Sequence, residues 1–284
     1  MSRGELGDAR RPRRQRVKRS AFLLYGVVAY AAFIGTTLYA IGFVAGVVVP
    51  RSVDAGGTVA PFTTALGVNL ALLVLFGVQH SVMARKGFKE AWTRIVPRPI
   101  ERSTYVLASS ACLALLFLLW HPIPRVVWSV ESSAARIGLV AVAVLGWLVA
   151  LFSTFLINHL ELFGLRQVYL ATRRTEPRPP RFTTPLLYRF VRHPLYLGFI
   201  LAFWAAPTMT VGHLVFALGM LGYILAGIQL EERDLVREFG ARYVAYREQV
   251  RALVPIPRAM PGEGETLLRP ESAVSCRAPG SRTG

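Results

Sequence analysis

The chain has 284 residues, of which 53% are hydrophobic, and a formal net charge of +17. With a mean hydropathy of +0.43 it is more apolar than soluble domains, in which about half of the residues are apolar even when glycine is counted. Its two cysteines cannot form a disulfide framework, so the composition excludes a soluble domain and a disulfide-stabilised secreted one.

Four uncharged apolar runs come first, and each has close to the length of about 20 residues that a membrane-spanning helix needs. They cover residues 21–49, 64–83, 103–120 and 137–157. A longer stretch, 194–230, is interrupted at residues 207–210. As one helix it would measure more than about 50 Å, against a hydrocarbon core of about 30 Å. We therefore expect a hairpin with a short first arm, about 194–206, and a spanning second arm, about 211–230.

Lysine and arginine are concentrated in every second connection. They crowd residues 1–20, the connections after the second and fourth runs, and the segment after the hairpin, whereas the other connections carry only Arg51, Arg125 and Arg136. Positive residues stay on the cytoplasmic side of a membrane. The sequence thus predicts an all-α polytopic protein of the cytoplasmic (inner) membrane, with about six transmembrane helices and both termini in the cytoplasm.

Three regions follow from this layout. Residues 1–20 form a basic cytoplasmic tail, which we interpret as an orientation signal rather than a nucleic-acid-binding arm, so no nucleic-acid partner is expected. Residues 21–257 form the membrane domain in the lipid bilayer. Residues 258–284, rich in Gly, Pro and Ser without apolar periodicity, are expected to be disordered.

Polar side chains cluster at the predicted cytoplasmic ends of the spans. Polar groups in membrane helices are costly and often functional, although at span ends they can merely meet the lipid headgroups. Here four segments bring such groups to one depth, which favours a site. Their histidines lack metal-ligand spacing, and no metal is expected. The residues are Gln79, His80, Asn158, His159, Glu161, His193, Gln229, Glu231 and Glu232.

The most informative segment opens the hairpin and begins with Arg192 and His193. Pro194 suits the first position of a helix. The two basic residues then stand at the positive helix end, where an anionic group is favoured. Tyr196 offers an aromatic face, and Gly198 would allow close approach to a ligand.

Glu231 and Glu232 close the same hairpin and suit a cationic partner. A ligand that bridges both ends should therefore carry a carboxylate, a cation and a flat ring. The alternative is that the Arg-His-Pro segment is only a helix cap and that the two acids form a solvated face.

The pattern R-H-P-x-Y-x-G, hairpin, E-E and F-G-x-x-Y-x-x-Y resembles the isoprenylcysteine carboxyl methyltransferase and phospholipid methyltransferase superfamily over residues 183–255. These are membrane enzymes that use S-adenosylmethionine (SAM). The resemblance implies that the hairpin closes a cofactor site on the cytoplasmic side. The cofactor-binding residues that the resemblance implies are Tyr188, His193, Pro194, Leu195, Tyr196 and Glu231, with Glu232 adjacent. Arg192, at the positive helix end, and Gly198, which would allow close approach to a ligand, are added to this set on the physical grounds given above.

Segments 22–28, 79–85, 96–99, 101–105 and 163–168 resemble the NnrU-related branch and, within it, the methanethiol S-methyltransferase family, which makes dimethyl sulfide. This resemblance extends over about 20–257 and implies methanethiol as substrate and SAM as cofactor. The carboxyl methyltransferases hold the acceptor carboxylate with an arginine shortly before the acid pair. The equivalent place is near Gly227, where this chain has no arginine, which argues against a carboxylate acceptor.

Methyl transfer from a sulfonium to a thiolate annihilates charge, so a dry site favours it. Alkyl thiols ionise above pH 8, and a base or a positive field is therefore useful. His159 and His80 are the candidate bases, and Arg166 could supply the field. Two alternatives stay open: a methyltransferase for a lipid or prenylcysteine, and a non-catalytic NnrU-type membrane factor. The sequence leaves the oligomeric state open.

Overall fold

The structure is a computed structural model that describes residues 3–173, 175 and 182–255, with the side chains from residue 19 onward. The predicted tail, 258–284, and the side chains of residues 1–18 lie outside this part. The described elements are α1 (Arg3–Ala45), α2 (Phe62–Ala84), α3 (Lys86–Trp92), α4 (Arg98–Leu119), β1 (Val126–Ser129), α5 (Ser133–Ile157), α6 (His159–Leu162), α7 (Leu165–Arg173), the 3-10 helix η1 (Leu186–Arg189), α8 (Pro194–Trp204), β2 (Thr208–Thr210), α9 (Val211–Phe239) and α10 (Ala241–Gln249).

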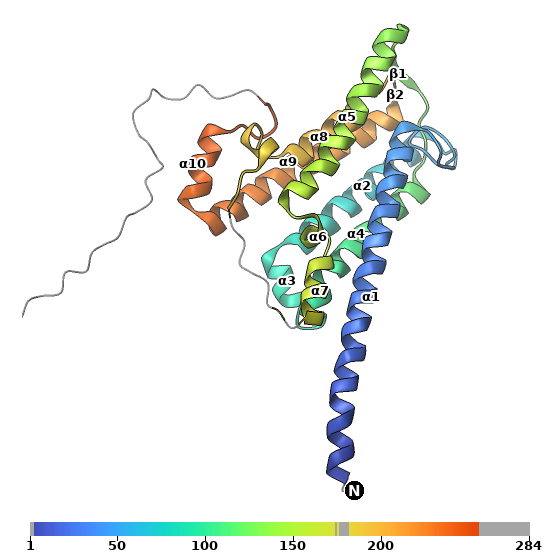
Figure 1. Ribbon diagram of the computed structural model, residues 1–284. Coiled ribbons are helices and arrows are strands. Elements are labelled where there is room, and N and C mark those ends of the chain that lie inside the picture. Colours follow the sequence, from blue (N-terminus) through green and yellow to red (C-terminus); the bar gives the residue numbers. More distant parts are fainter. Residues whose placement is uncertain (1–2, 174, 176–181, 256–284) are drawn as a thin grey trace, which may run out of the picture.

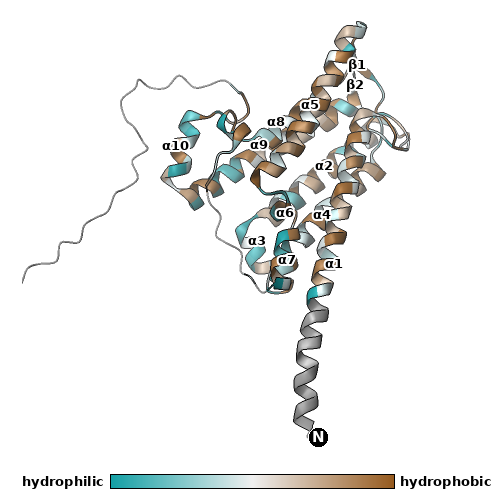
Figure 2. Ribbon diagram, viewed as in Figure 1, coloured by the Kyte–Doolittle hydropathy of each residue, from teal (hydrophilic) through white to brown (hydrophobic). Residues whose placement is uncertain are grey.

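Five of the described helices are long and apolar enough to cross a membrane: residues 19–45 of α1, and α2, α4, α5 and α9. They coincide with the four predicted apolar runs and the second arm of the hairpin, so the prediction of an all-α integral membrane protein is confirmed. Figure 2 shows hydrophobic residues along the long helices, and hydrophilic residues gathered on α3, α7 and α10. A bilayer around the long helices would leave the short polar ones at its surface.

The fifth predicted span, the first arm of the hairpin, is shorter than the others. α8 has 11 residues, or about 16 Å of helix, which does not reach across a hydrocarbon core of about 30 Å. The chain continues to β2, which pairs antiparallel with β1 in the connection between α4 and α5 (Figure 1). α8 and the segment after it therefore run from the α10 end of the bundle to the sheet end. A count of six spanning helices stays a prediction.

α8 is held against α5 by small residues. A Cβ atom added to Gly198 would lie 2.5 Å from both the backbone nitrogen of Ala150 and the carbonyl oxygen of Gly146, and one added to Gly146 would lie 2.6 Å from the nitrogen of Ala202. Small residues four apart let two membrane helices approach this closely. The contact fixes the rotation of α8, and with it the direction of the side chains at its N-terminal end.

The main hydrophobic core lies near the sheet end. Phe43, Trp120, Phe203 and Phe216, each close to an end of its helix, pack together there. The indole of Trp120 also donates a hydrogen bond of 3.0 Å to the carbonyl of Val53. The opposite end, where α9 meets α10, holds most of the polar residues that the sequence singles out.

Candidate active site

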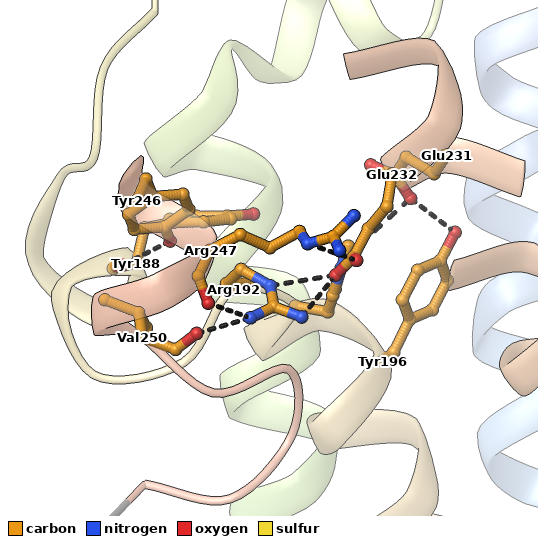
Figure 3. A network of polar contacts seen from close by, with 9 residues as sticks. Tyr188, Arg192, Tyr196, Glu231, Glu232, Tyr246, Arg247 and Val250 are labelled. Carbon is orange, nitrogen blue, oxygen red and sulfur yellow. Dashed lines mark hydrogen bonds and ion pairs between the residues drawn. The ribbon is translucent and has the colours of Figure 1, made fainter. Parts of the chain in front are cut away.

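The candidate site is built where three segments meet: the start of α8, the last turns of α9, and α10 with the residues after it. The backbone nitrogens of Arg192 and His193 donate to the carbonyls of Arg251 and Ala252, at 2.9 and 3.0 Å. Tyr246 on α10 donates its hydroxyl to the carbonyl of Tyr188 (Figure 3). These bonds close the chain around the start of α8, so its side chains are held from several directions.

Glu232 lies at the centre of a buried charge network. Arg192 Nε and His193 Nε2 lie 2.8 and 3.0 Å from Glu232 Oε1, and Arg247 Nε lies 3.8 Å from Oε2. The side chains of Glu232 and Arg192 are only 12% and 9% exposed. Arg192 also donates to the carbonyls of Arg247 and Val250. This network joins the start of α8 to α9 and α10.

Glu231 has a different environment, because successive residues of a helix point about 100° apart. Its Oε2 accepts a hydrogen bond of 3.0 Å from the hydroxyl of Tyr196, and His193 Nδ1 lies 3.9 Å from the same oxygen (Figure 3). The Glu231 side chain is 43% exposed. An ionised carboxylate has about four acceptor positions, and the Tyr196 bond fills only one. Of the two predicted acids, Glu231 is therefore the one available to a cationic ligand.

The space beside Tyr196 depends on Gly227, one turn before Glu231. A Cβ at Gly227 would lie 3.7 Å from the Tyr196 hydroxyl oxygen, which is ordinary contact. A longer side chain at this position would extend into the space beside that hydroxyl. The glycine therefore leaves space near the position at which the carboxyl methyltransferases carry the arginine that holds the acceptor carboxylate.

A pocket of about 400 Å³ lies on the opposite face of α9, between α9 and α10. Its volume falls in the range of about 300–1,000 Å³ that is typical of small-ligand sites, and its walls are mainly polar. The pocket and Glu231 flank the same part of α9. The lining residues are Arg192, Gln229, Glu232, Arg233, Val244, Arg247 and Glu248.

Three other predicted cofactor residues have clear structural places. Pro194 is the first residue of α8 and is buried. Gly198 is packed against α5, so helix packing explains its small size. Tyr188 lies in η1, and burial, with the charge of Glu231, raises the pKa of its phenol; burial also raises the pKa of Tyr246 to about 12. Both phenols therefore stay neutral hydrogen-bond donors at neutral pH.

The two candidate bases occupy different places. His80 on α2 lies between α4 and α9: its Nε2 is 2.5 Å from the hydroxyl of Tyr105, its Nδ1 is 3.1 Å from Ser109 Oγ, and its ring meets Tyr223 edge-on at 5.8 Å. Tyr223 lies on the same face of α9 as Glu231. Sequence reasoning did not select Tyr105 as a site residue, because a tyrosine in an apolar run is usually a core residue.

His159 has both ring nitrogens in hydrogen bonds of 2.7 Å, one to the hydroxyl of Tyr30 and one to that of Thr154. Its ring stacks on Phe155 at 4.2 Å. Burial lowers the pKa of His159, so the ring is neutral at pH 7. The described partners of this ring come from α1, α5 and Phe163, and not from α8 or α9.

Arg166 pairs with Glu161, which also accepts a hydrogen bond of 2.8 Å from the side chain of Asn158. This ion pair offsets the positive field that the sequence suggested for Arg166. The structure therefore brings His80 toward the face of α9 that carries Glu231, and it places His159 and Arg166 in a second polar cluster beside α1.

Comparison with curated proteins decides the family. The chain is 55% identical over 237 residues to methanethiol S-methyltransferase 1 of Bradyrhizobium diazoefficiens, covering 84% of this chain and 83% of the relative. It is 54% identical over 241 residues to the methanethiol S-methyltransferase of Mycobacterium tuberculosis, covering 85% and 98%. The enzyme of that name from Pseudomonas deceptionensis is 52% identical over 247 residues, covering 87% and 94%.

The chain belongs to the methanethiol S-methyltransferase family. No protein-family model and no solved structure matches it. Membership of the methanethiol S-methyltransferase family confirms the resemblance inferred from the motifs and identifies a membrane methyltransferase. The roles of individual residues of this chain stay predictions.

Proposed function

We propose that the protein transfers a methyl group from SAM to methanethiol and releases dimethyl sulfide. The observation that carries this proposal is the identity of 54% to a methanethiol S-methyltransferase of which the alignment covers 98%. A similarity over almost the whole relative includes the acceptor side of the protein as well as the hairpin that resembles the wider superfamily.

The residues around Glu231 suit SAM, which supplies an electrophilic methyl group on a sulfonium cation when it is bound. Glu231 offers a half-exposed carboxylate to a cation, and the ring of Tyr196 lies beside it. His193 and Tyr188 would add neutral or positive donors for the polar parts of the ligand. The Glu232–Arg192 network holds these groups in place, so the protein positions the donor instead of reacting with it.

Replacing Glu231 by glutamine is expected to weaken SAM binding about tenfold or more. The amide keeps the shape of the side chain but removes the charge, and a hydrogen bond to a charged group contributes roughly 1.5–3 kcal/mol. Isothermal titration of the purified protein with SAM measures the effect independently of activity. Glu238→Gln, on an exposed position of the same helix, is the matched control and should bind SAM like the wild type.

Unfolding curves in detergent should show that Glu231→Gln stays folded, because the one side-chain hydrogen bond that Glu231 makes within the described residues is to Tyr196. If SAM affinity were unaltered both in Glu231→Gln and in His193→Ala, the donor site would have to lie elsewhere.

We further infer that both termini face the cytoplasm and that the α4–α5 connection, with β1, faces outside. This assignment rests on the arginine and lysine residues, which gather at the α3 and α10 end and are scarce at the sheet end. Reporter fusions at Gly57 and Pro124 should read outside, and fusions at Arg94 should read inside. An inside reading at Gly57 or Pro124 would contradict the orientation.

The acceptor assignment predicts that activity falls as the alkyl chain of the thiol grows. A small apolar thiol needs no polar handle in a dry pocket, so selection is steric, and each methylene that does not fit costs about 1–3 kcal/mol by overpacking. Headspace analysis with methanethiol, ethanethiol and propanethiol measures the series. If the protein bound SAM but methylated only a prenylcysteine or a phospholipid, the acceptor would be a lipid.

A further inference from the structure

A chain of three polar side chains crosses from α4 to α2 and back, in the part of the bundle that faces α9. The hydroxyl of Tyr105 lies 2.5 Å from His80 Nε2, and His80 Nδ1 lies 3.1 Å from Ser109 Oγ. Tyr105 and Ser109 are one helical turn apart on α4, so one face of that helix holds both ends of the imidazole. Tyr105 is only 6% exposed.

The donors and acceptors of this chain give it a direction. In the tautomer with the ring proton on Nδ1, Nε2 accepts from the Tyr105 phenol, and the Nδ1 proton is directed at Ser109. The phenol oxygen has two lone pairs; the side chain of Ser109 is hydrogen-bonded to it as well, which leaves one acceptor position. Tyr105 can therefore accept a proton on its oxygen while it passes its own proton to His80.

The Tyr105–His80 pair lies beside the face of α9 that carries Glu231. Tyr223 on α9 contacts His80 edge-on and lies two turns before Glu231 on the same helix face. An ion pair of 2.7 Å between Arg85 and Asp234 also joins the C-terminal end of α2 to α9.

We propose that Tyr105 is a catalytic residue that takes the proton of the acceptor thiol and passes its own proton to His80. This proposal rests on the proposed function. The S–H bond breaks and its proton moves to Tyr105 Oη, while the phenolic proton moves to His80 Nε2. The sulfur then forms a bond to the methyl carbon as the bond from that carbon to the sulfonium breaks. The products are two neutral thioethers and a protonated His80, which later loses its proton to water.

The same geometry separates the two candidate bases. His80 is bonded to a phenol that keeps one acceptor position for the thiol proton. His159 is bound at both nitrogens by the hydroxyls of Tyr30 and Thr154 and stacks on Phe155, which suits a structural role in joining α1 to α5. We therefore assign the proton transfer to the Tyr105–His80 pair.

The pH dependence of this pair is set by the charged and titratable groups around it. They come from the end of α2, from α4, from α8 and from α9. These groups are Arg85, Arg102, Tyr196, Tyr223 and Glu231.

The test compares Tyr105→Phe and His80→Gln with the wild type, using SAM, methanethiol and headspace detection between pH 6 and 9. Loss of general base catalysis should lower the rate at pH 7 by about 100-fold. The rate of each variant should then rise about tenfold for each pH unit until the thiol itself ionises, above pH 8, whereas the wild-type rate should be flat from about pH 7 upward. SAM affinity, measured by titration, should stay within twofold of the wild type.

Two controls separate chemistry from structure. Tyr39→Phe removes a phenolic hydrogen bond of 3.3 Å to the carbonyl of Arg51, near the sheet end, and should keep the wild-type rate and profile. His159→Gln should keep the flat profile, whatever its stability. A more acidic acceptor such as trifluoroethanethiol, which is largely ionised without help, should shrink the deficit of Tyr105→Phe to less than about tenfold.

If the wild type formed dimethyl sulfide but Tyr105→Phe kept its rate and flat pH profile, Tyr105 would not be the proton acceptor. A wild type that forms no dimethyl sulfide at all would instead overturn the proposed function. An equal deficit of Tyr105→Phe with both thiols would indicate a packing role for the tyrosine and would also contradict the proposal.

Discussion

Replacing Gly198 by valine is expected to abolish folded protein. A Cβ at this position would lie 2.5 Å from backbone atoms of Ala150 and Gly146, which cannot move away as the end of a flexible side chain can. α5 and α8 would have to separate over their whole contact, at a cost of about 3 kcal/mol or more. Because α8 also carries His193 and Tyr196, any molecules that still fold should lose the geometry around Glu231.

The measurements are the yield of monodisperse protein in detergent and the midpoint of its thermal unfolding. Gly222→Ala is the matched control, because Gly222 is also in a helix but a Cβ there would meet nothing within 4 Å. It should be neutral or stabilising by up to about 1 kcal/mol. A Gly198→Val protein with a wild-type midpoint would show that α5 and α8 do not pack as described.

Replacing Glu232 by alanine is expected to lower the free energy of unfolding by about 3 kcal/mol. Removing one partner of a buried ion pair leaves the other charge without compensation, which typically costs about 3–5 kcal/mol. The partner here is Arg192, which is 9% exposed, with His193 and Arg247 beside it. The lower end of the range applies because the network opens onto the pocket between α9 and α10.

Chemical or thermal unfolding in detergent measures this effect, with Glu238→Gln as the control on the same helix. Glu231→Gln should unfold close to the wild type, because Glu231 is half-exposed and, among the described residues, accepts one hydrogen bond from Tyr196 and has His193 Nδ1 at 3.9 Å. Of the two neighbouring acids, Glu232 should therefore affect stability, and Glu231 should affect ligand binding. Equal destabilisation by both variants would contradict the different roles assigned to them.

The apolar runs predicted the long helices closely. The run 137–157 became α5 (Ser133–Ile157), and the run 64–83 became α2 (Phe62–Ala84). The interruption at residues 207–210 is occupied by β2, so the hairpin was also predicted. The sheet itself was not, because β1 and β2 lie far apart in the chain and pair through only a few residues. α6 and α7 are short, and no run of apolar residues marks them.

In the candidate site, the sequence predicted that the start of α8 lies near the acid pair Glu231 and Glu232. The hydrogen bond between Tyr196 and Glu231 and the pair between Arg192 and Glu232 agree with that proximity. The different roles of the two acids could not be predicted, because they depend on how α9 is rotated against α8. The Tyr105–His80 bond likewise required the packing of α2 on α4, which the sequence does not encode as a local pattern.

The most direct test is transfer of an isotopically labelled methyl group. Purified wild-type protein in lipid nanodiscs would receive SAM with a trideuterated methyl group and unlabelled methanethiol, and the headspace would be analysed by mass spectrometry. We expect dimethyl sulfide that carries one trideuterated methyl, formed with equal amounts of S-adenosylhomocysteine, and much less of it from Glu231→Gln at the same SAM concentration. Unlabelled dimethyl sulfide only, or no dimethyl sulfide from a protein that binds SAM, would contradict a SAM-dependent thiol methyltransferase.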